Sequence, residues 1–152
     1  MSLVQNHTSI ALVRNPDGHE QSWLAIWVAQ HKWYSFVKAE RIEAESWREC
    51  LDRELSWVLP VQRGKDYLIS TMARLHLEET VYDPETSEEQ HVAFEFYVVD
   101  PYGRRGKDAF SNLTETRWLT NSELRAGQAS DGAQIDPELT ALLHRADILP
   151  KG

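Results

Sequence analysis

Residues 45–58 read ESWRECLDRELSWV, and this segment predicts the first helix of the chain. Ser46 stands three positions before Glu49, which is the spacing of a capping box. In that motif the hydroxyl accepts a first-turn amide and the carboxylate accepts the N–H of the capping residue. Apolar residues then recur at helical spacing, at Trp47, Leu51, Leu55 and Val58. We therefore expect a helix that begins after Ser46, ends near Leu59 and buries this apolar stripe.

The same segment resembles the signature of the Nudix hydrolases, G-x5-E-x7-R-E-U-x-E-E-x-G-U, in which U is a bulky aliphatic residue. With Glu45 at the first glutamate, the chain has Arg53, Glu54 and Leu55 at the R-E-U positions, so four positions match in one register. The other positions depart from the signature. Ala39 replaces its first glycine, and Pro60 replaces its late glycine. Trp57 and Val58 replace its glutamate pair.

This resemblance implies a metal-dependent hydrolase of a nucleoside diphosphate linked to another moiety, with Mg²⁺ or Mn²⁺ as the cofactor. It implies catalytic roles for Glu54 and Arg53 and metal binding by Glu54 and Glu45. Hard divalent cations need several carboxylate ligands, and only Glu54 remains of three acids that would converge within one helical turn. We therefore expect an impaired metal site. Replacement carboxylates would have to come from other segments, at Glu40, Glu43, Glu78, Glu79 or Glu95.

Several of these residues also have a purely structural interpretation. Glu49 is explained by its capping role without any metal. Arg53 with Glu54 is either a catalytic pair or a structural one, because an arginine can hold a loop carbonyl or carboxylate in a fixed fork. We expect Trp57 and Val58 in the hydrophobic core, since an indole and a β-branched side chain gain from burial.

The segments before the helix read as strands. Residues 9–13 and 23–28 are short apolar runs separated by turn-forming residues 15–18, and we expect them to form a hairpin. Residues 32–36 follow as an aromatic strand. In that strand Trp33 and Tyr34, together with the distant Trp118, are candidates for binding a substrate base by stacking, although the same rings also suit a core.

The segments after the helix complete the expected fold. Residues 67–77 and 91–99 are strand candidates, and their polar connection predicts an antiparallel pair. Residues 117–124 resemble the family's late strand and short capped helix. Asp136 and Pro137 then suit the N-cap and first position of a terminal helix. We expect a single domain over residues 1–152, an α/β/α sandwich around a mixed sheet, with the Nudix resemblance covering roughly residues 8–146.

Composition restricts the partners. The chain has 152 residues, 41% of them hydrophobic, which suits one domain with a sizeable core. Its net charge is −8, and residues 104–107 form its one basic cluster in the sequence, so we expect no nucleic-acid partner. One cysteine and no apolar run of about 20 residues indicate a soluble cytoplasmic protein without a membrane span or internal disulfides.

The six histidines show no paired metal spacing, so we expect no histidine metal centre. Two functional classes therefore remain open. The first is the divergent hydrolase, and the second is a Nudix-like module that binds a nucleotide, a related metabolite or a protein partner without turnover. A homodimer is also left open.

Overall fold

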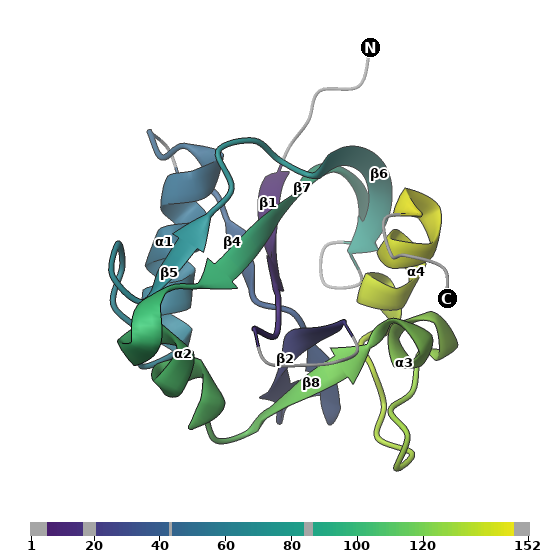
Figure 1. Cartoon of the computed structure of the whole chain (residues 1–152). Coiled ribbons are helices and arrows are strands. Elements are labelled where there is room, and N and C mark those ends of the chain that lie inside the picture. The colour runs from purple at the N-terminus through teal and green to yellow at the C-terminus, as the bar shows by residue number, and fades with distance from the viewer. Residues whose placement is uncertain (1–5, 17–20, 43, 84–86, 148–152) are drawn as a thin grey trace.

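The computed structural model describes residues 6–16, 21–42, 44–83 and 87–147. Within them, the larger sheet contains five strands: β1 (Asn6–Val13), β4 (Lys38–Glu40), β5 (Tyr67–Ile69), β6 (Leu75–Asp83) and β7 (Glu88–Pro101). A smaller sheet contains three strands: β2 (Ser22–Val28), β3 (Trp33–Ser35) and β8 (Thr116–Thr120). The helices are α1 (Trp47–Val58), α2 (Gly103–Ser111), α3 (Asn121–Ala126) and α4 (Pro137–Ala146) (Figure 1).

The larger sheet is mixed because its two central strands run parallel. β1 pairs with β7 from Asn6↔Val92 to Val13↔Val99, and β4 is antiparallel to β1 on its other side. β5 and β6 are both antiparallel to β7 and pair with successive parts of it. The expected mixed sheet is therefore confirmed.

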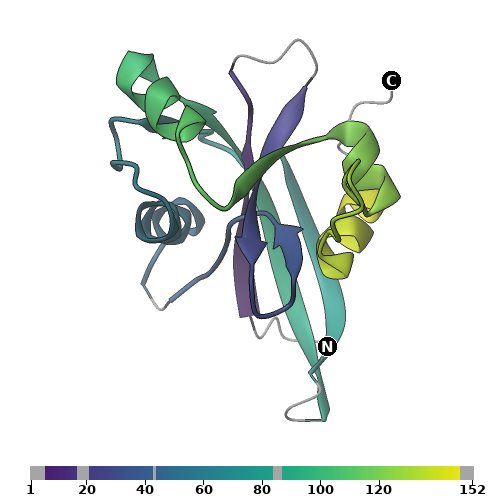
Figure 2. The same ribbon diagram turned by 90° about the horizontal axis from the view of Figure 1, so that it is seen from below.

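The two faces of the larger sheet carry separate cores. Because side chains alternate along a strand, Ile10 and Leu12 of β1 enter one core while Ala11 and Val13 enter the other. Helices α1 and α2 cover one face, and α3 and α4 lie on the other side of the molecule (Figure 2). This arrangement confirms the expected α/β/α sandwich. Within the described segments, none of the helices has the length and apolar character needed to span a bilayer.

Helix α1 begins and ends where the sequence predicts. The amide of Glu49 donates to Ser46 Oγ over 3.1 Å, and the amide of Ser46 donates to Glu49 Oε1 over 3.0 Å. The helix ends with Leu59 as its C-cap, and its inner side buries Leu51 and Leu55. The capping box and the helix boundaries are confirmed.

The expected burial of Trp57 and Val58 is wrong. Trp57 is 84% exposed and Val58 is 37% exposed. At about 100° per residue, Trp57 lies about 200° around the helix from Leu55 and therefore faces away from the core. The buried stripe continues instead from Leu55 to Leu59, four positions later.

The expected hairpin between residues 9–13 and 23–28 is also wrong. The strands exist, but β1 lies in the larger sheet and β2 in the smaller one. Their backbone pairing is limited to the ends that are close in sequence, where Arg14 and Trp23 form an antiparallel bridge and the amide of Asn15 donates to the carbonyl of Ser22 over 3.0 Å. Both edges of β1 are occupied by β7 and β4, so β2 pairs with β3 and β8 instead. Part of the predicted turn lies outside the described residues.

Residues 67–77 form two strands rather than one. Ile69 pairs with Val99 and Leu75 pairs with Phe96. The chain therefore advances six residues from β5 to β6 while the facing part of β7 advances only three. The surplus residues loop outward between β5 and β6, as in an extended bulge. The antiparallel pairing with β7 is confirmed, and so are the late strand with its capped helix and the terminal helix.

Helix α2 was not predicted from the sequence, which showed only its basic residues. Its position depends on Gly106, which lies directly against the backbone of Asp66. The amide of Tyr102 donates to the carbonyl of Asp66 over 2.9 Å, and Phe110 is buried in the core shared with α1. A side chain at position 106 would overlap the Asp66 carbonyl oxygen.

We therefore expect Gly106→Ala to lower the free energy of unfolding by about 1–3 kcal/mol through this overlap. Alanine favours a helix over glycine by up to about 1 kcal/mol. If Gly106 did not touch Asp66, Gly106→Ala would therefore raise the free energy of unfolding instead. Urea unfolding gives the sign directly. Lys107→Ala, at an exposed position of the same helix, is the control and should change the stability by no more than about 0.5 kcal/mol.

Candidate functional site

Arg53 ties α1 to the segment that precedes it. Its Nε donates to Glu45 Oε2 over 2.9 Å, and its Nη2 donates to Glu45 Oε1 over 3.2 Å and to the carbonyl of Glu40 over 2.9 Å. Glu54 lies farther away, with Oε2 at 3.4 Å from Arg53 Nη1. These contacts are those expected of a structural fork.

The fork also fixes the charge of Glu45. The hydrogen bond from Arg53, followed by one from the amide of Ile42, lowers the pKa of the Glu45 carboxyl. The same hydrogen bond raises the pKa of Arg53. Glu45 therefore has both carboxylate oxygens engaged, and metal binding by Glu45 would have to displace these contacts.

The described residues do not fit a divalent metal centre on α1. Among them, no group of three or more His, Cys, Asp or Glu side chains is arranged to hold a metal ion. Trp57 and Val58 stand where the signature has its glutamate pair, and they bring no oxygen ligand to the position beside Glu54. The chemistry of the donor set thus disagrees with the cofactor that the sequence resemblance implies.

The candidate replacement carboxylates have other partners or lie elsewhere. On the sheet, His76 Nδ1 lies 2.9 Å from Glu95 Oε2, and His91 Nε2 lies 3.2 Å from Glu78 Oε1. Glu79 accepts a hydrogen bond of 2.6 Å from an arginine of α4. Glu40 has an exposed side chain on β4, and Glu43 lies outside the described residues.

A cleft of ≈490 Å³ opens between the smaller sheet and the start of α4. This volume lies within the range of about 300–1,000 Å³ typical of small-molecule sites. Its lining combines an apolar wall with a few polar groups, and consists of Ile26, Val28, His31, Trp33, Ser35, Phe36, Lys38, Asp136, Pro137 and Glu138.

The polar end of the cleft is held together by backbone pairing across about 100 residues. The segment before α4 runs beside β3, where the amide of Tyr34 donates to Gln134 and the amide of Asp136 donates to Tyr34, each over 2.9 Å. This pairing brings the start of α4 next to Ser35 and Lys38. Cleft and helix are therefore positioned by the same strand.

Asp136 is the centre of this arrangement and is only 5% exposed. Its Oδ2 accepts from Lys38 Nζ over 2.6 Å and from Ser35 Oγ over 2.9 Å, and its Oδ1 accepts from the Glu138 amide over 3.0 Å. Burial acts to raise the pKa of Asp136, but Lys38, Ser35 and the amide outweigh it, so the pKa is lowered. The carboxylate stays ionised and caps α4.

Of the three aromatic residues predicted to bind substrate, the structure places Trp33 in the cleft. Its ring stacks on that of His31, with centroids 4.6 Å apart and planes 20° from parallel. Tyr34 and Trp118 are not among the lining residues and pack against the two cores. Sequence reasoning missed the role of Lys38 and Glu138 in the cleft, because nothing local links them.

The cleft continues toward the larger sheet. A hollow of ≈340 Å³ shares Lys38 and Glu138 with it, and a third hollow of ≈360 Å³ shares Phe94 and Glu138 with the second. Glu138 thus lines all three. Glu40 lines the second hollow and accepts from Arg53 through its carbonyl, so the Arg53 fork and the cleft meet at β4.

Solved structures of Nudix proteins match this fold over most of the chain. The Ap4A hydrolase of C. elegans is 10% identical, with 94% of this chain and 96% of that chain covered and a TM-score of 0.60. The Nudix hydrolase RenU of M. smegmatis is 14% identical, with coverages of 94% and 84% and a TM-score of 0.60. The NUDIX domain of Shewanella oneidensis NrtR, solved with ADP ribose, is 12% identical, with coverages of 95% and 88% and a TM-score of 0.60.

No protein-family model matches the sequence, and no curated protein is similar enough to count as a match. At identities of 10–14%, the structural likeness establishes the fold. The chain therefore has the Nudix fold, as its first helix suggested.

Proposed function

We propose that this protein is a Nudix-fold binding module that holds a nucleotide-like ligand in the cleft beside α4 and does not hydrolyse it by the metal-dependent route. The observation that carries this proposal is the contrast between two regions. The cleft has a suitable volume, an apolar wall and fixed polar groups, whereas α1 has Trp57 and Val58 where metal ligands would be needed.

The cleft offers complementary groups for a base and its substituents. The stacked rings of Trp33 and His31 present a flat face, which suits a nucleobase. Glu138 is half exposed, and among the described residues its carboxylate accepts one hydrogen bond, of 3.2 Å, from Lys38. It therefore has capacity to accept from an amino group of the ligand. Asp136 is engaged on both oxygens and is a support for these groups rather than a ligand contact.

A second candidate function is hydrolysis of a nucleoside diphosphate linked to another moiety. Arg53 and Glu54 at the matched signature positions favour it, and so do neighbours whose names describe hydrolases. It would require Mg²⁺ or Mn²⁺ held by Glu54 together with groups that move on binding. Under this alternative, Glu54 and Arg53 keep their catalytic roles.

We place the protein in the cytoplasm. Cys50, its one cysteine, is fully buried, with Sγ at 3.3 Å from Ser9 Oγ. Burial raises the pKa of this thiol, which makes it unreactive. A single inert thiol fits a reducing compartment.

Calorimetric titration with a panel of nucleoside diphosphate derivatives, including ADP-ribose, tests both functions. We expect binding by the wild type, weakened about tenfold or more in Trp33→Ala because base stacking is worth about 1–3 kcal/mol. Trp57→Ala is the matched control at an exposed tryptophan and should bind normally. We expect no product when Mn²⁺ is added to the bound complex.

Three further outcomes separate the candidates. Cleavage that requires Mn²⁺, stops with a chelator and is lost in Glu54→Gln would establish the hydrolase. Gain of Mn²⁺ binding in Trp57→Glu with Val58→Glu, and not in the wild type, would show that these two positions removed the metal site. No binding across the panel would reject a nucleotide-like ligand altogether.

A further inference from the structure

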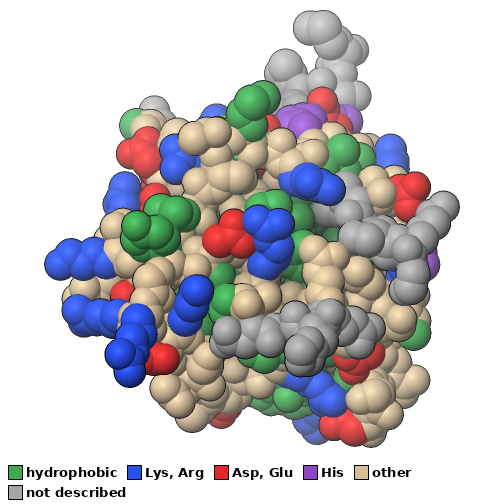
Figure 3. Space-filling view, viewed as in Figure 1, with side chains coloured by type: hydrophobic (Ala, Val, Ile, Leu, Met, Phe, Trp, Pro, Cys, Tyr) green, Lys and Arg blue, Asp and Glu red, His purple; other side chains and the backbone are tan. Residues whose placement is uncertain are grey.

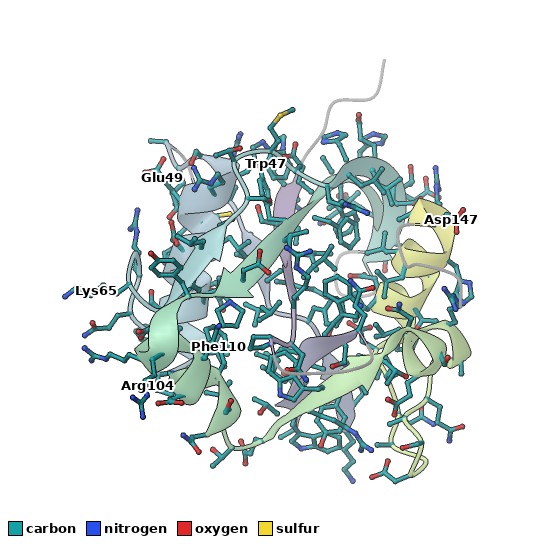
Figure 4. All side chains as sticks on the ribbon, viewed as in Figure 1. Trp47, Glu49, Lys65, Arg104, Phe110 and Asp147 are labelled. Carbon is teal, nitrogen blue, oxygen red and sulfur yellow. The ribbon has the colours of Figure 1, made fainter. Side chains whose placement is uncertain are left out.

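A basic surface lies at the end of the molecule formed by α2 and the turn before β5. The chain has 16 Lys and Arg and a net charge of −8. Five exposed basic side chains form this surface: Arg63, Lys65, Arg104, Arg105 and Lys107. Figure 3 shows blue side chains gathered on this side. In Figure 4 Lys65 and Arg104 point outward from the same side.

The contact of Gly106 with Asp66 explains why these charges gather. Arg105 and Lys107 flank Gly106 on the helix, and Lys65 immediately precedes Asp66 on the turn, so the close approach brings the two sets together. Nearby acids neutralise only part of the charge. Asp66 itself is buried, Asp108 is exposed on α2 beside Lys107, and Asp52 pairs with Arg63 at 3.5 Å. In the described part of the chain, the other four cations have no ion-pair partner; they are Lys65, Arg104, Arg105 and Lys107.

The opposite charge is concentrated on the ribbon formed by β6 and β7. Residues 75–103 contain no Lys or Arg. On β6, Glu78 and Glu79 pair with His91 and Arg145 of the same chain, so the acidic charge that the ribbon offers a partner lies at Glu88 and Glu89 of β7. Toward the ribbon's tip, Glu88 and Glu89 are exposed, and Tyr82, paired with Glu89, is 60% exposed. Figure 2 shows this ribbon projecting beyond the body of the molecule, at the end away from α2.

We propose that the ribbon of one copy of this chain docks on the basic surface of a second copy. The two surfaces are complementary in charge, and because they lie at opposite ends they cannot satisfy each other within one chain. Tyr82 on the ribbon and the 57% exposed Tyr102 at the start of α2 supply an aromatic centre inside a charged rim. The contact joins different surfaces of the two copies, so it is head-to-tail and leaves both outer ends free.

Such a contact is weak and salt-sensitive, because exposed ion pairs contribute little individually and are screened. Sedimentation equilibrium over a range of protein concentrations measures it. At about 50 mM NaCl the wild type should form dimers and longer assemblies as its concentration rises, and at about 500 mM NaCl it should sediment as a single chain.

Charge reversal gives the decisive test. Arg104→Glu with Arg105→Glu, and separately Glu88→Lys with Glu89→Lys, should each weaken the association at least about tenfold. Mixing the two variants should restore association in equal proportions. The unchanged ribbon of the first variant matches the unchanged basic surface of the second, and the two reversed surfaces match each other. Glutamates in the first turn of α2 suit the helix dipole, so the first variant should fold. Lys32→Glu with Arg74→Glu is the control for the Arg104 and Arg105 variant. It changes the net charge by the same amount at other exposed sites and should leave the association intact.

A wild type that sediments as a single chain at low salt and high concentration would overturn the proposal, and so would variants that fail to pair when mixed. Binding of inorganic polyphosphate or a single-stranded oligonucleotide at the basic surface, without self-association, would assign that surface to another polyanion and likewise overturn it.

Discussion

Asp136→Ala should lower the free energy of unfolding by about 3–5 kcal/mol, the range seen when one partner of a buried ion pair is removed. The change leaves Lys38 without the carboxylate at 2.6 Å, and Ser35 without its acceptor. It also removes the cap of α4. Because Asp136 joins β3, β4 and α4, its loss weakens three elements together, and urea unfolding should show it clearly.

Asp136→Asn separates the charge from the cap, because the amide can still accept from the Glu138 N–H. It should retain part of the stability. Glu138→Gln is the control, since its contact with Lys38 is longer and exposed, and should cost no more than about 1 kcal/mol. Equal losses for Asp136→Ala and Glu138→Gln would show that the buried pair does not stabilise the fold.

Asp136 should also affect how the free energy of unfolding falls at acid pH. Its pKa is lowered in the folded protein, below the value of about 3.9 in an unfolded chain. Its stabilising contribution is therefore complete above about pH 4 and is lost as the pH falls through the folded pKa. Between neutral and acid pH, Asp136→Asn should lose less stability than the wild type.

Leu55→Ala is the second substitution with a large expected effect, about 2–5 kcal/mol, because Leu55 is fully buried where α1 meets the sheet. Trp57→Ala, on the outer side of the same helix, should change the stability by no more than about 0.5 kcal/mol. Urea unfolding of both variants measures the contrast.

The result for Trp57→Ala decides whether its indole has a packing role. A large loss for Trp57→Ala would place its indole in a packed environment and restore the interpretation that the lost metal ligands became core residues. A small loss would mean that position 57 has no packing role, so a carboxylate can be placed there without disturbing the helix.

Local sequence determined the boundaries of α1 and the start of α4. The Ser46–Glu49 box and Asp136 with Pro137 act through hydrogen bonds and dihedral preferences within a few residues. Four matched signature positions were likewise sufficient to suggest the Nudix fold. The antiparallel strands of the second half were predictable because a short polar connection leaves few ways to pair them.

Tertiary structure alone decided where the predicted elements meet. β2 left β1 because β7 and β4 already occupy both edges of β1, and those strands come from other parts of the chain. Position on the helix, rather than hydrophobicity, put Trp57 in solvent. The cleft depends on Lys38 meeting Asp136, about 100 residues apart, and α2 depends on Gly106 reaching Asp66. Such long-range contacts arise from packing, whose energy depends on the whole fold and leaves no local pattern in the sequence.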